Sequence, residues 1–502
     1  MGSERRDLRF SSKSRIKTLK TKLTSISPPL FVATSFLVSR LLYIRAGLRF
    51  DNTPLRYFVQ LIDPQLLKNN LLESLWYLHS QPPLFNLVTG LLYQRFSPQS
   101  KVFQLLFFIM GLAFGLALYW LGLRLGLKPW VSALLAVWFT VSPATVLYEN
   151  LYFYTYPVAF VLVLSALALS KFLETNNFWW GFGFFSLIAS LCLTWALFHL
   201  FWMVAVIALV GVFYRDWRRL LLISSIPVIV VAGWYAKNSF LFGSFSASSW
   251  VGMNLSDVTF LSPLTPQAVR DELMERKEIS PYPIVEAFRA IENYQGLLPV
   301  PGPHGIPILD QPLTSTESVN FNHVFYIGLS ERMLKDALNF IRAHPRLYLA
   351  SVRQGFSIFF HSSSDYLLLK DKPTPQLESL WDRIFYGQLS SYGEDPRNRW
   401  ENHPMYVGWW LVIAYLAAVI YGLKLSFARD RSRPALTGVA AFMTFTIIFF
   451  ALMANFLDLG ENNRFRFALD PFVLLLFGLL IQTVIINVSR RREQRLVSPM
   501  KL

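Results

Sequence analysis

Residues 434–488 read PALTGVAAFMTFTIIFFALMANFLDLGENNRFRFALDPFVLLLFGLLIQTVIINV, which is two long apolar blocks joined by a short polar segment. The blocks Pro434–Phe456 and Phe467–Val488 each have the roughly 20 residues that a helix needs to cross a hydrocarbon core of about 30 Å. A strand of a membrane barrel needs only about 10 residues, so these blocks are too long for barrel strands. The stretch therefore predicts two membrane-spanning helices with polar residues between them.

The rest of the chain repeats this pattern, which predicts an all-α polytopic membrane protein with about ten transmembrane helices. The 502 residues are 53% hydrophobic and 16% charged, against about 25% charged in soluble domains. The 44 Phe, 21 Tyr and 15 Trp suit aromatic belts at the two membrane surfaces. The other eight predicted spans are Pro28–Ile44, Lys101–Leu123, Pro129–Tyr148, Pro157–Phe172, Phe178–Trp195, Leu200–Tyr214, Leu220–Trp234 and Pro404–Leu423.

The distribution of charge predicts the orientation. The formal net charge of +16 is concentrated in a basic arm at 1–27, in short loops between spans and in a basic tail at 489–502. Cytoplasmic segments of membrane proteins carry such an excess of Lys and Arg, so we predict that both termini are cytoplasmic. No small-residue cleavage site follows the first apolar block, which favours an uncleaved helix over a signal peptide. No nucleic-acid-binding motif accompanies the charge, so no nucleic-acid partner is expected.

This topology leaves two external regions. Spans 1–7 and a first external loop at 45–100 make up residues 28–236. In that loop, Pro82–Phe96 is apolar but too short for a span, and suits a juxtamembrane or re-entrant helix. A large extracytoplasmic region covers 237–403, with amphipathic helical spacing at Pro266–Glu278 and Ser330–Ala343. Spans 8–10 follow in 404–488. The single cysteine, Cys192, excludes an intrachain disulfide.

Acidic residues follow the first and third predicted spans on the external side. Asp51 and Asp63 lie in the first loop, and Glu149 ends the third span. A carboxylate at the membrane surface can act as a general base on a hydroxyl, but a solvated loop acid or a helix-end charge is the simpler alternative. His199 lies near the outer ends of spans 5 and 6, and the first loop also carries the run that includes His79, Gln81, Pro82, Pro83 and Asn86.

The polar segment before the last span, DLGENNRFR at 458–466, contains two arginines that break the positive-inside pattern. Arg464 and Arg466 lie close to Glu461. The planar guanidinium group suits bidentate contact with phosphate. The alternative is snorkelling contact with lipid head groups, whose phosphate is the same ligand. The chain has no Gly-rich phosphate loop, no His-Glu-x-x-His and no Gly-x-Ser-x-Gly motif.

Five segments, in this order, carry a family resemblance: Asp51 with Pro82-Pro83 about thirty residues later; Glu149; Trp234–Asn238 with Phe242-Gly243-Ser244 and Gly252–Leu255; His344–Tyr348; and Glu461–Arg466 before Pro471. They resemble the polytopic lipid-linked-sugar glycosyltransferases of the C-type (GT-C) fold. The most similar branch is family 39, with protein O-mannosyltransferases and lipid A aminoarabinose transferases. The chain departs from that pattern at Asn52 after the acid, at Gln81 in place of a loop lysine, and at Lys237 in place of arginine.

The resemblance implies a mechanism of sugar transfer. A polyprenyl-phosphate sugar would lie with its lipid in a groove between helices. Asp51 would be the general base on an acceptor hydroxyl, which attacks the anomeric carbon with inversion. Asp63 is the reserve candidate for the base, and Glu149 would position acceptor or sugar. Arg464, Arg466 and Lys237 would neutralise the phosphate leaving group.

The partners implied are a polyprenyl-phosphate sugar donor, a lipid, glycan or protein hydroxyl acceptor, and membrane lipid. No cofactor is expected, and a divalent metal is left open. The location expected is a bacterial cytoplasmic membrane, with the active site on the extracytoplasmic side. Two alternatives stay open: a transporter or lipid flippase of the cell envelope, and an assembly factor that binds partners through its external loop. A transporter needs ionisable residues at mid-membrane depth, whereas the polar residues here cluster at the outer ends of the predicted spans.

Overall fold

The computed structural model describes residues 27–96, 99–283, 286–366, 368–369, 373–390, 404–428 and 434–497. The predicted basic arm lies outside the described residues except for Ser27, as does the end of the basic tail. Within the described residues the regular elements are helices, apart from two isolated β-bridges, Asp51–Leu151 and Leu313–Val319. The predicted all-α class is confirmed.

A helix lies at each of the ten predicted spans. Within the described residues six helices are long and apolar enough to cross a membrane, and α8 with α9 counts as a seventh if the bent pair is one span. α11 and α12 are apolar but have only 15 residues each, so the count of ten stays a prediction. The ten predicted spans are occupied, in chain order and with α8 and α9 together at the third, by α2 (Pro28–Arg45), α7 (Gln99–Arg124), α8 (Pro129–Val141), α9 (Pro143–Glu149), α10 (Thr155–Thr175), α11 (Phe178–Cys192), α12 (Leu200–Tyr214), α13 (Trp217–Phe242), α20 (Trp409–Phe427), α21 (Pro434–Leu457) and α23 (Asp470–Val497).

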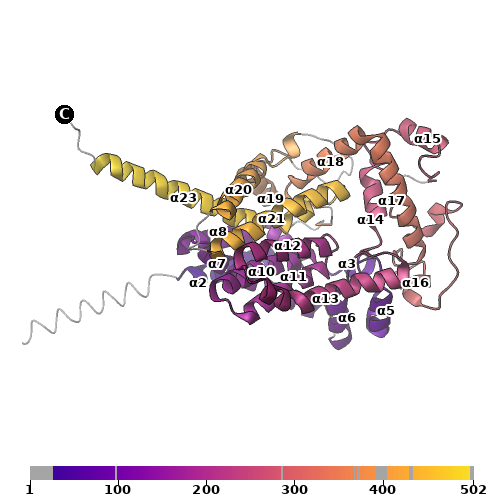
Figure 1. Cartoon of the computed structure of the whole chain (residues 1–502), viewed down its shortest axis with the longest axis horizontal. Helices are drawn as coiled ribbons and strands as arrows, with labels where there is room; N and C mark the ends of the chain where they lie inside the picture. The colour runs from indigo at the N-terminus through magenta and orange to yellow at the C-terminus, as the bar shows by residue number, and fades with distance from the viewer. Residues whose placement is uncertain are drawn as a thin grey trace, which may run out of the picture.

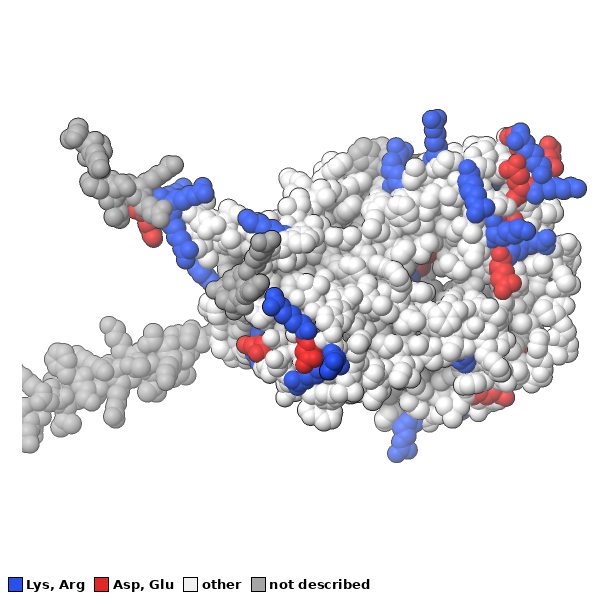
Figure 2. Space-filling view, in the orientation of Figure 1, with Lys and Arg blue, Asp and Glu red and all other residues white. Residues whose placement is uncertain are grey.

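The centre of the bundle is formed by α10 and α21. In their most apolar windows 67% and 61% of the residues are buried, against 28–44% in the other four long helices. The outward-facing side chains of those helices are themselves apolar, as at Ile229 and Ile420, which are both 67% exposed. A helix that is apolar on its outer face is solvated by lipid. Figure 2 shows Lys and Arg gathered toward two ends of the molecule, with a largely uncharged surface between them.

The third predicted span is bent by 60° between α8 and α9. Pro143 lacks the N–H that would continue the helical ladder, so it begins a new helix instead. The hydroxyl group of Ser142 donates to the Phe139 carbonyl oxygen (2.8 Å) and accepts from the Thr145 N–H (3.4 Å). These bonds satisfy backbone groups that the break would otherwise leave unpaired.

A layer of shorter helices covers one end of the bundle, and we call this layer the cap (Figure 1). α23 projects from the opposite end. The predicted juxtamembrane helix is present as α6, and the two predicted amphipathic segments correspond to α15 and α17. The cap consists of α3 (Pro54–Tyr57), α4 (Pro64–Asn69), α5 (Leu71–Tyr77), α6 (Leu84–Arg95), α14 (Val251–Val258), α15 (Gln267–Glu275), α16 (Pro307–Asp310), α17 (Phe325–Ala343) and α18 (Pro345–Phe359).

The cap has its own apolar core, in which α14 packs directly on α17. Trp250, Met253, Tyr326 and Met333 are buried in this core. The helices approach so closely at Gly252 that a Cβ atom there would lie 1.8 Å from the carbonyl oxygen of Ser330. The sequence therefore needs a glycine at this crossing.

We expect Gly252→Ala to destabilise the cap by about 1–3 kcal/mol, the usual effect of an overpacked contact. The measurement is the apparent melting temperature of the purified protein in detergent, together with the rate of proteolysis in 251–343. Gly328→Ala is the matched control, because a Cβ atom at that position on α17 would meet nothing within 4 Å. Equal stability of the two variants would contradict this account of the crossing.

Candidate functional site

A cavity of about 810 Å³ lies between the cap and the helix bundle. One wall comes from the first loop at 57–60, and another from the segment 246–257 before and within α14. The floor is made by the ends of α12 and α21 and by α22 (Asn462–Phe467). Its polar lining residues include Gln60, Gln81, Tyr154, His199, Asn254, Asp257, Asp458, Glu461 and Arg464.

α22 is held in place by its two asparagines. The Asn462 amide donates to the Ala454 and Asp458 carbonyl oxygens, at 3.2 and 3.1 Å, and accepts from the Gly460 N–H at 3.0 Å. Gly460 has φ 126°, a conformation that glycine adopts without strain. The Asn463 amide donates to the Ser362 carbonyl oxygen at 2.9 Å. The Glu-Asn-Asn sequence therefore fixes the short helix that carries the two arginines.

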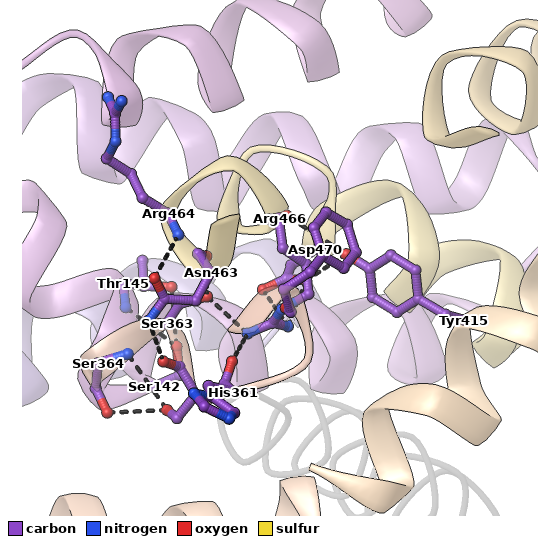
Figure 3. A network of polar contacts seen from close by, with 12 residues as sticks. Ser142, Thr145, His361, Ser363, Ser364, Tyr415, Asn463, Arg464, Arg466 and Asp470 are labelled. Carbon is purple, nitrogen blue, oxygen red and sulfur yellow. Dashed lines mark hydrogen bonds and ion pairs between the residues drawn. The ribbon is translucent and has the colours of Figure 1, made fainter. Parts of the chain in front are cut away.

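The Arg466 side chain points in a different direction from that of Arg464 (Figure 3), does not line the cavity, and has all its donors bonded. Its guanidinium group donates twice to the Asp470 carboxylate (2.9 and 3.1 Å) and once to each of the carbonyl oxygens of Phe359 (2.7 Å) and His361 (2.9 Å). The fifth bond goes to the Ser363 hydroxyl at 2.7 Å. A guanidinium group has five N–H donors, so none is left for a phosphate.

Arg464 lines the cavity and has an unused donor. Its Nη2 lies 2.5 Å from Glu461 Oε2, and its Nη1 makes long bonds of 3.4 Å to the Tyr154 and Thr155 hydroxyls. The Nε–H group is buried and has no hydrogen-bond partner in the described chain. The side chain is 1% exposed, and the Trp195 ring centroid lies 5.2 Å from the guanidinium carbon. A buried unpaired N–H on a cation is the condition for binding an anion.

Three carboxyl groups share the cavity with this arginine. Burial, and then the neighbouring charge of Glu461, raise the pKa of Asp458 to about 7, although Arg464 opposes the shift. Burial, followed by the charge of Asp458, raises the pKa of Asp257 well above its ordinary value. The Glu461 carboxylate also accepts a hydrogen bond from the Tyr366 hydroxyl at 2.9 Å. The cavity therefore contains one carboxyl group, Asp458, that titrates near neutral pH, and a second, Asp257, whose pKa is also raised.

Sequence reasoning missed Asp257 and Asp458 as site residues. Asp458 heads the polar segment in which Glu461 and both arginines were selected. Asp257 follows Asn254 by three residues on α14 and lies on the same helix face, so the Gly252–Leu255 motif marks the correct helix. No sequence pattern predicts that Asp257 and Asp458 lie close together, because they are about 200 residues apart in sequence.

Four of the residues predicted from sequence line this cavity together: Gln81, His199, Glu461 and Arg464. His199 also caps α12, where its Nδ1 accepts from the Phe201 N–H at 3.2 Å. Gln81 comes from the first loop just before Pro82, and Pro83 is the N-cap of α6. The first loop, the turn before α12 and the segment before the last span thus meet at one site.

The three predicted catalytic acids are not among the described residues that line the cavity. Asp51 Oδ1 accepts from the Thr53 N–H (2.8 Å) and hydroxyl (2.6 Å) in a local turn. Asp63 caps α4 and accepts from the Ser315 N–H at 2.7 Å, which joins the first loop to the second external region. Glu149 forms a buried ion pair with Arg40, with Nη2–Oε2 and Nε–Oε1 distances of 2.5 and 3.0 Å.

The remaining predicted residues hold the first loop against its neighbours. Lys237 Nζ donates to the Leu78 carbonyl oxygen at 2.6 Å. His79 lies within 2.7 Å of the Ser249 hydroxyl and 2.8 Å of the Asn322 carbonyl oxygen, and burial lowers its pKa to about 4. The Asn86 amide accepts from the Ile62 N–H at 2.9 Å. These contacts position the loop that supplies Gln81, and the role of Lys237 in phosphate contact stays a prediction.

Among the described residues no group of three or more His, Cys, Asp or Glu side chains could hold a metal ion.

Fold and cavity together define a polytopic membrane protein with a polar site under a helical cap. No protein-family model matches the chain, and no curated protein matches it. Among solved structures it is similar to an archaeal oligosaccharyltransferase, AglB from Archaeoglobus fulgidus, in complex with an inhibitory peptide and a dolichol-phosphate. The similarity covers 94% of this chain and 52% of that one, at 12% identity and a TM-score of 0.34. The chain thus spans about half the length of that structure.

The Arg40–Glu149 pair gives a prediction that separates a structural role from a catalytic one. Glu149→Gln leaves a buried guanidinium group uncompensated, so we expect a loss of about 3–5 kcal/mol of stability. The measurement is thermal unfolding in detergent. Replacing both residues by Met should recover part of the loss, because it removes both buried charges. A Glu149→Gln protein as stable as wild type would contradict this role and would favour the predicted positioning role instead.

Proposed function

We propose that this protein is a membrane glycosyltransferase that moves a sugar from a polyprenyl-phosphate donor to a hydroxyl acceptor in the cavity under the cap. The observation that carries the proposal is the unpaired, buried Nε–H of Arg464, in a cavity that also contains a carboxyl group titrating near pH 7. Transfer of a sugar from a phosphate leaving group requires two groups: a hydrogen-bond donor that binds the anion and a base that accepts a proton. The resemblance found in the sequence points to the same reaction.

The donor phosphate would bind Arg464 through its free Nε–H, with Nη2 exchanging Glu461 for a phosphate oxygen. The surrounding aromatic rings keep water away and strengthen this interaction. The raised pKa of Asp257 favours its protonated form, which adds no negative charge against the phosphate and can donate a hydrogen bond to it or to the sugar.

The lipid chain of the donor would follow the apolar floor of the cavity. Phe449, Met453 and Leu457 of α21 and Phe201 of α12 line this floor. Phe201 is 71% exposed, so the apolar surface continues from the cavity to the lipid-facing side of the bundle. A polyprenyl chain can therefore lie in the membrane while its phosphate reaches Arg464.

Asp458 is the residue that we assign as general base. The acceptor oxygen forms a bond to the anomeric carbon, the bond from that carbon to the phosphate oxygen breaks, and the acceptor proton passes to the Asp458 carboxylate. The phosphate leaves with the bonding electrons and is stabilised by Arg464. The assignment of Asp51 from the sequence stays a prediction, and the experiment tests both acids separately.

We expect Asp458→Asn to lower the turnover number about 10²–10⁴-fold, the usual contribution of a general base. The measurement is transfer of radiolabel from a panel of polyprenyl-phosphate sugars to acceptors in membrane extract. Asp271→Asn, an acid on α15 outside the cavity, is the matched control. Loss of transfer in Asp51→Asn with full activity in Asp458→Asn would restore the assignment made from the sequence. No transfer from any donor by folded wild-type protein would overturn the proposal.

Arg464→Gln should raise the KM for the donor and lower turnover, whereas Arg464→Lys should recover part of the binding because it retains the charge but loses the fork of donors. The weaker binding of the sugar donor is measured directly on the purified protein, by competition with a fluorescent polyprenyl phosphate. Arg270→Gln on α15 is the control. Unchanged donor affinity in Arg464→Gln would remove this residue from the phosphate site.

The rate should rise with pH through about 7, because Asp458 accepts a proton only when its carboxyl group is ionised. Glu461 and Arg464 are the charged groups that act on its pKa. Glu461→Gln removes the neighbouring negative charge that raises the pKa, so the rising limb should move to lower pH. The measurement is the pH profile of the transfer rate at saturating donor, and a profile in Glu461→Gln that does not move would contradict the assignment of Asp458.

A further inference from the structure

A second cavity, of about 590 Å³, lies on the other side of α22. It is enclosed by α8, α20 and α23 and by the short π-helix Asp382–Tyr386. None of its lining residues lines the cavity under the cap. Phe467 of α22 forms part of its wall, and its ring stacks on Phe139 with a centroid distance of 5.9 Å.

This cavity is apolar along its length and has polar groups only at one end. Tyr386, Tyr415 and Asp470 gather there, with Ser142 and Thr145 from the bend between α8 and α9. The other end is formed by Leu134 of α8 and by Gly478 and Ile481 of α23. Asp470 and Ile481 are 11 residues apart, which is about 16 Å along a helix. That depth is about half of a hydrocarbon core of roughly 30 Å, or one leaflet.

The rim of the second cavity opens sideways onto the lipid-facing surface. Leu134, Trp410, Ile413 and Ile481 line it and are 44–56% exposed. A hydrocarbon chain in the leaflet on the side of α22 can therefore enter between α8, α20 and α23 without crossing a polar surface.

Charge at the polar end decides which kind of lipid fits. The Asp470 carboxylate accepts two bonds from Arg466 and a third, at 2.7 Å, from the Tyr415 hydroxyl. The described lining contains no Lys or Arg, and Arg466 has no donor left. Because the Asp470 charge is already paired with Arg466, an anionic head group would find no free cation there, whereas a head group without net charge would meet hydroxyl groups.

We infer that this second cavity binds one acyl chain of a lipid whose head group carries no net charge, at a site separate from the proposed donor site. The walls, depth and rim of this cavity carry the inference, which does not depend on the proposed sugar transfer. A bound lipid here would pack against Phe467 at the end of α22, while Arg464 of the same helix lines the donor cavity.

The test is photolabelling of the full-length protein in nanodiscs with a phosphatidylcholine that carries a diazirine in the middle of one acyl chain. We expect labelled peptides from 134–145, 409–415 and 470–481, and loss of the label when unlabelled phosphatidylcholine is added in excess. The same diazirine chain on phosphatidylglycerol, which is anionic, should label these peptides less. Ala414→Phe, which fills the cavity from α20, should lose most of the labelling. Leu416→Phe, on the lipid-facing side of the same helix, should not.

Three outcomes would overturn the inference. Labelling spread evenly over all lipid-facing helices and unaffected by Ala414→Phe would mean ordinary boundary lipid. Labelling of the same peptides by a diazirine polyprenyl phosphate, with displacement of the phosphatidylcholine label, would make this the groove for the donor chain. Stronger labelling by phosphatidylglycerol than by phosphatidylcholine would contradict the charge argument. The lipid competition uses wild-type protein, so the test holds even if Ala414→Phe fails to fold.

Discussion

The neutralisation of Arg466 is the interaction on which the rest of the site depends. A buried guanidinium group is tolerated only when its charge is compensated and its donors are bonded, and here Asp470, Ser363 and two backbone carbonyl oxygens use all five. These partners come from α18, the segment after it and the start of α23. One side chain therefore ties the cap to the bundle and fixes α22 between two cavities. Together with the hydrogen bonds of Asn462 and Asn463, this anchor fixes the orientation of the six-residue α22.

Arg464 and Arg466 show how the same residue type, two positions apart, takes opposite roles. Two residues along a helix correspond to a rotation of roughly 200°, so one guanidinium group enters the protein interior and the other faces the donor cavity. All five donors of Arg466 are used in hydrogen bonds that hold the structure together. The outer arginine shares one carboxylate and retains a buried, unused donor. The difference between an anchor and a ligand-binding group lies in this count of partners, which a sequence motif does not reveal.

The sequence predicts most of the helices, because apolar blocks and their breaks are local properties. It also selects Gln81, His199, Glu461 and Arg464, which the fold brings to one cavity. It does not reveal the Arg40–Glu149 pair, since the partners are 109 residues apart and meet through helix packing. For the same reason Glu149 is read from the sequence as a surface acid. The bend at Pro143 is not predicted, because Pro129–Tyr148 reads as a single apolar block. Asp257 and Asp458 are missed because they are about 200 residues apart in sequence and meet only where the cap packs on the bundle.

The two cavities explain why the polar segment between the last two spans is so short. A longer loop would free α22 from α21 and α23, and Arg464 and Phe467 would no longer be held at fixed positions in the two cavities that they line. With Asn462 bonded to α21 and Arg466 bonded to Asp470, the segment is held from both ends. In the proposed reaction this rigidity matters for electrostatic reasons. A preorganised cation stabilises a developing phosphate charge without reorganising at the moment of transfer. Arg464 meets that condition because its neighbours on α22 are fixed by structure, while its own Nε–H stays unpaired for the substrate.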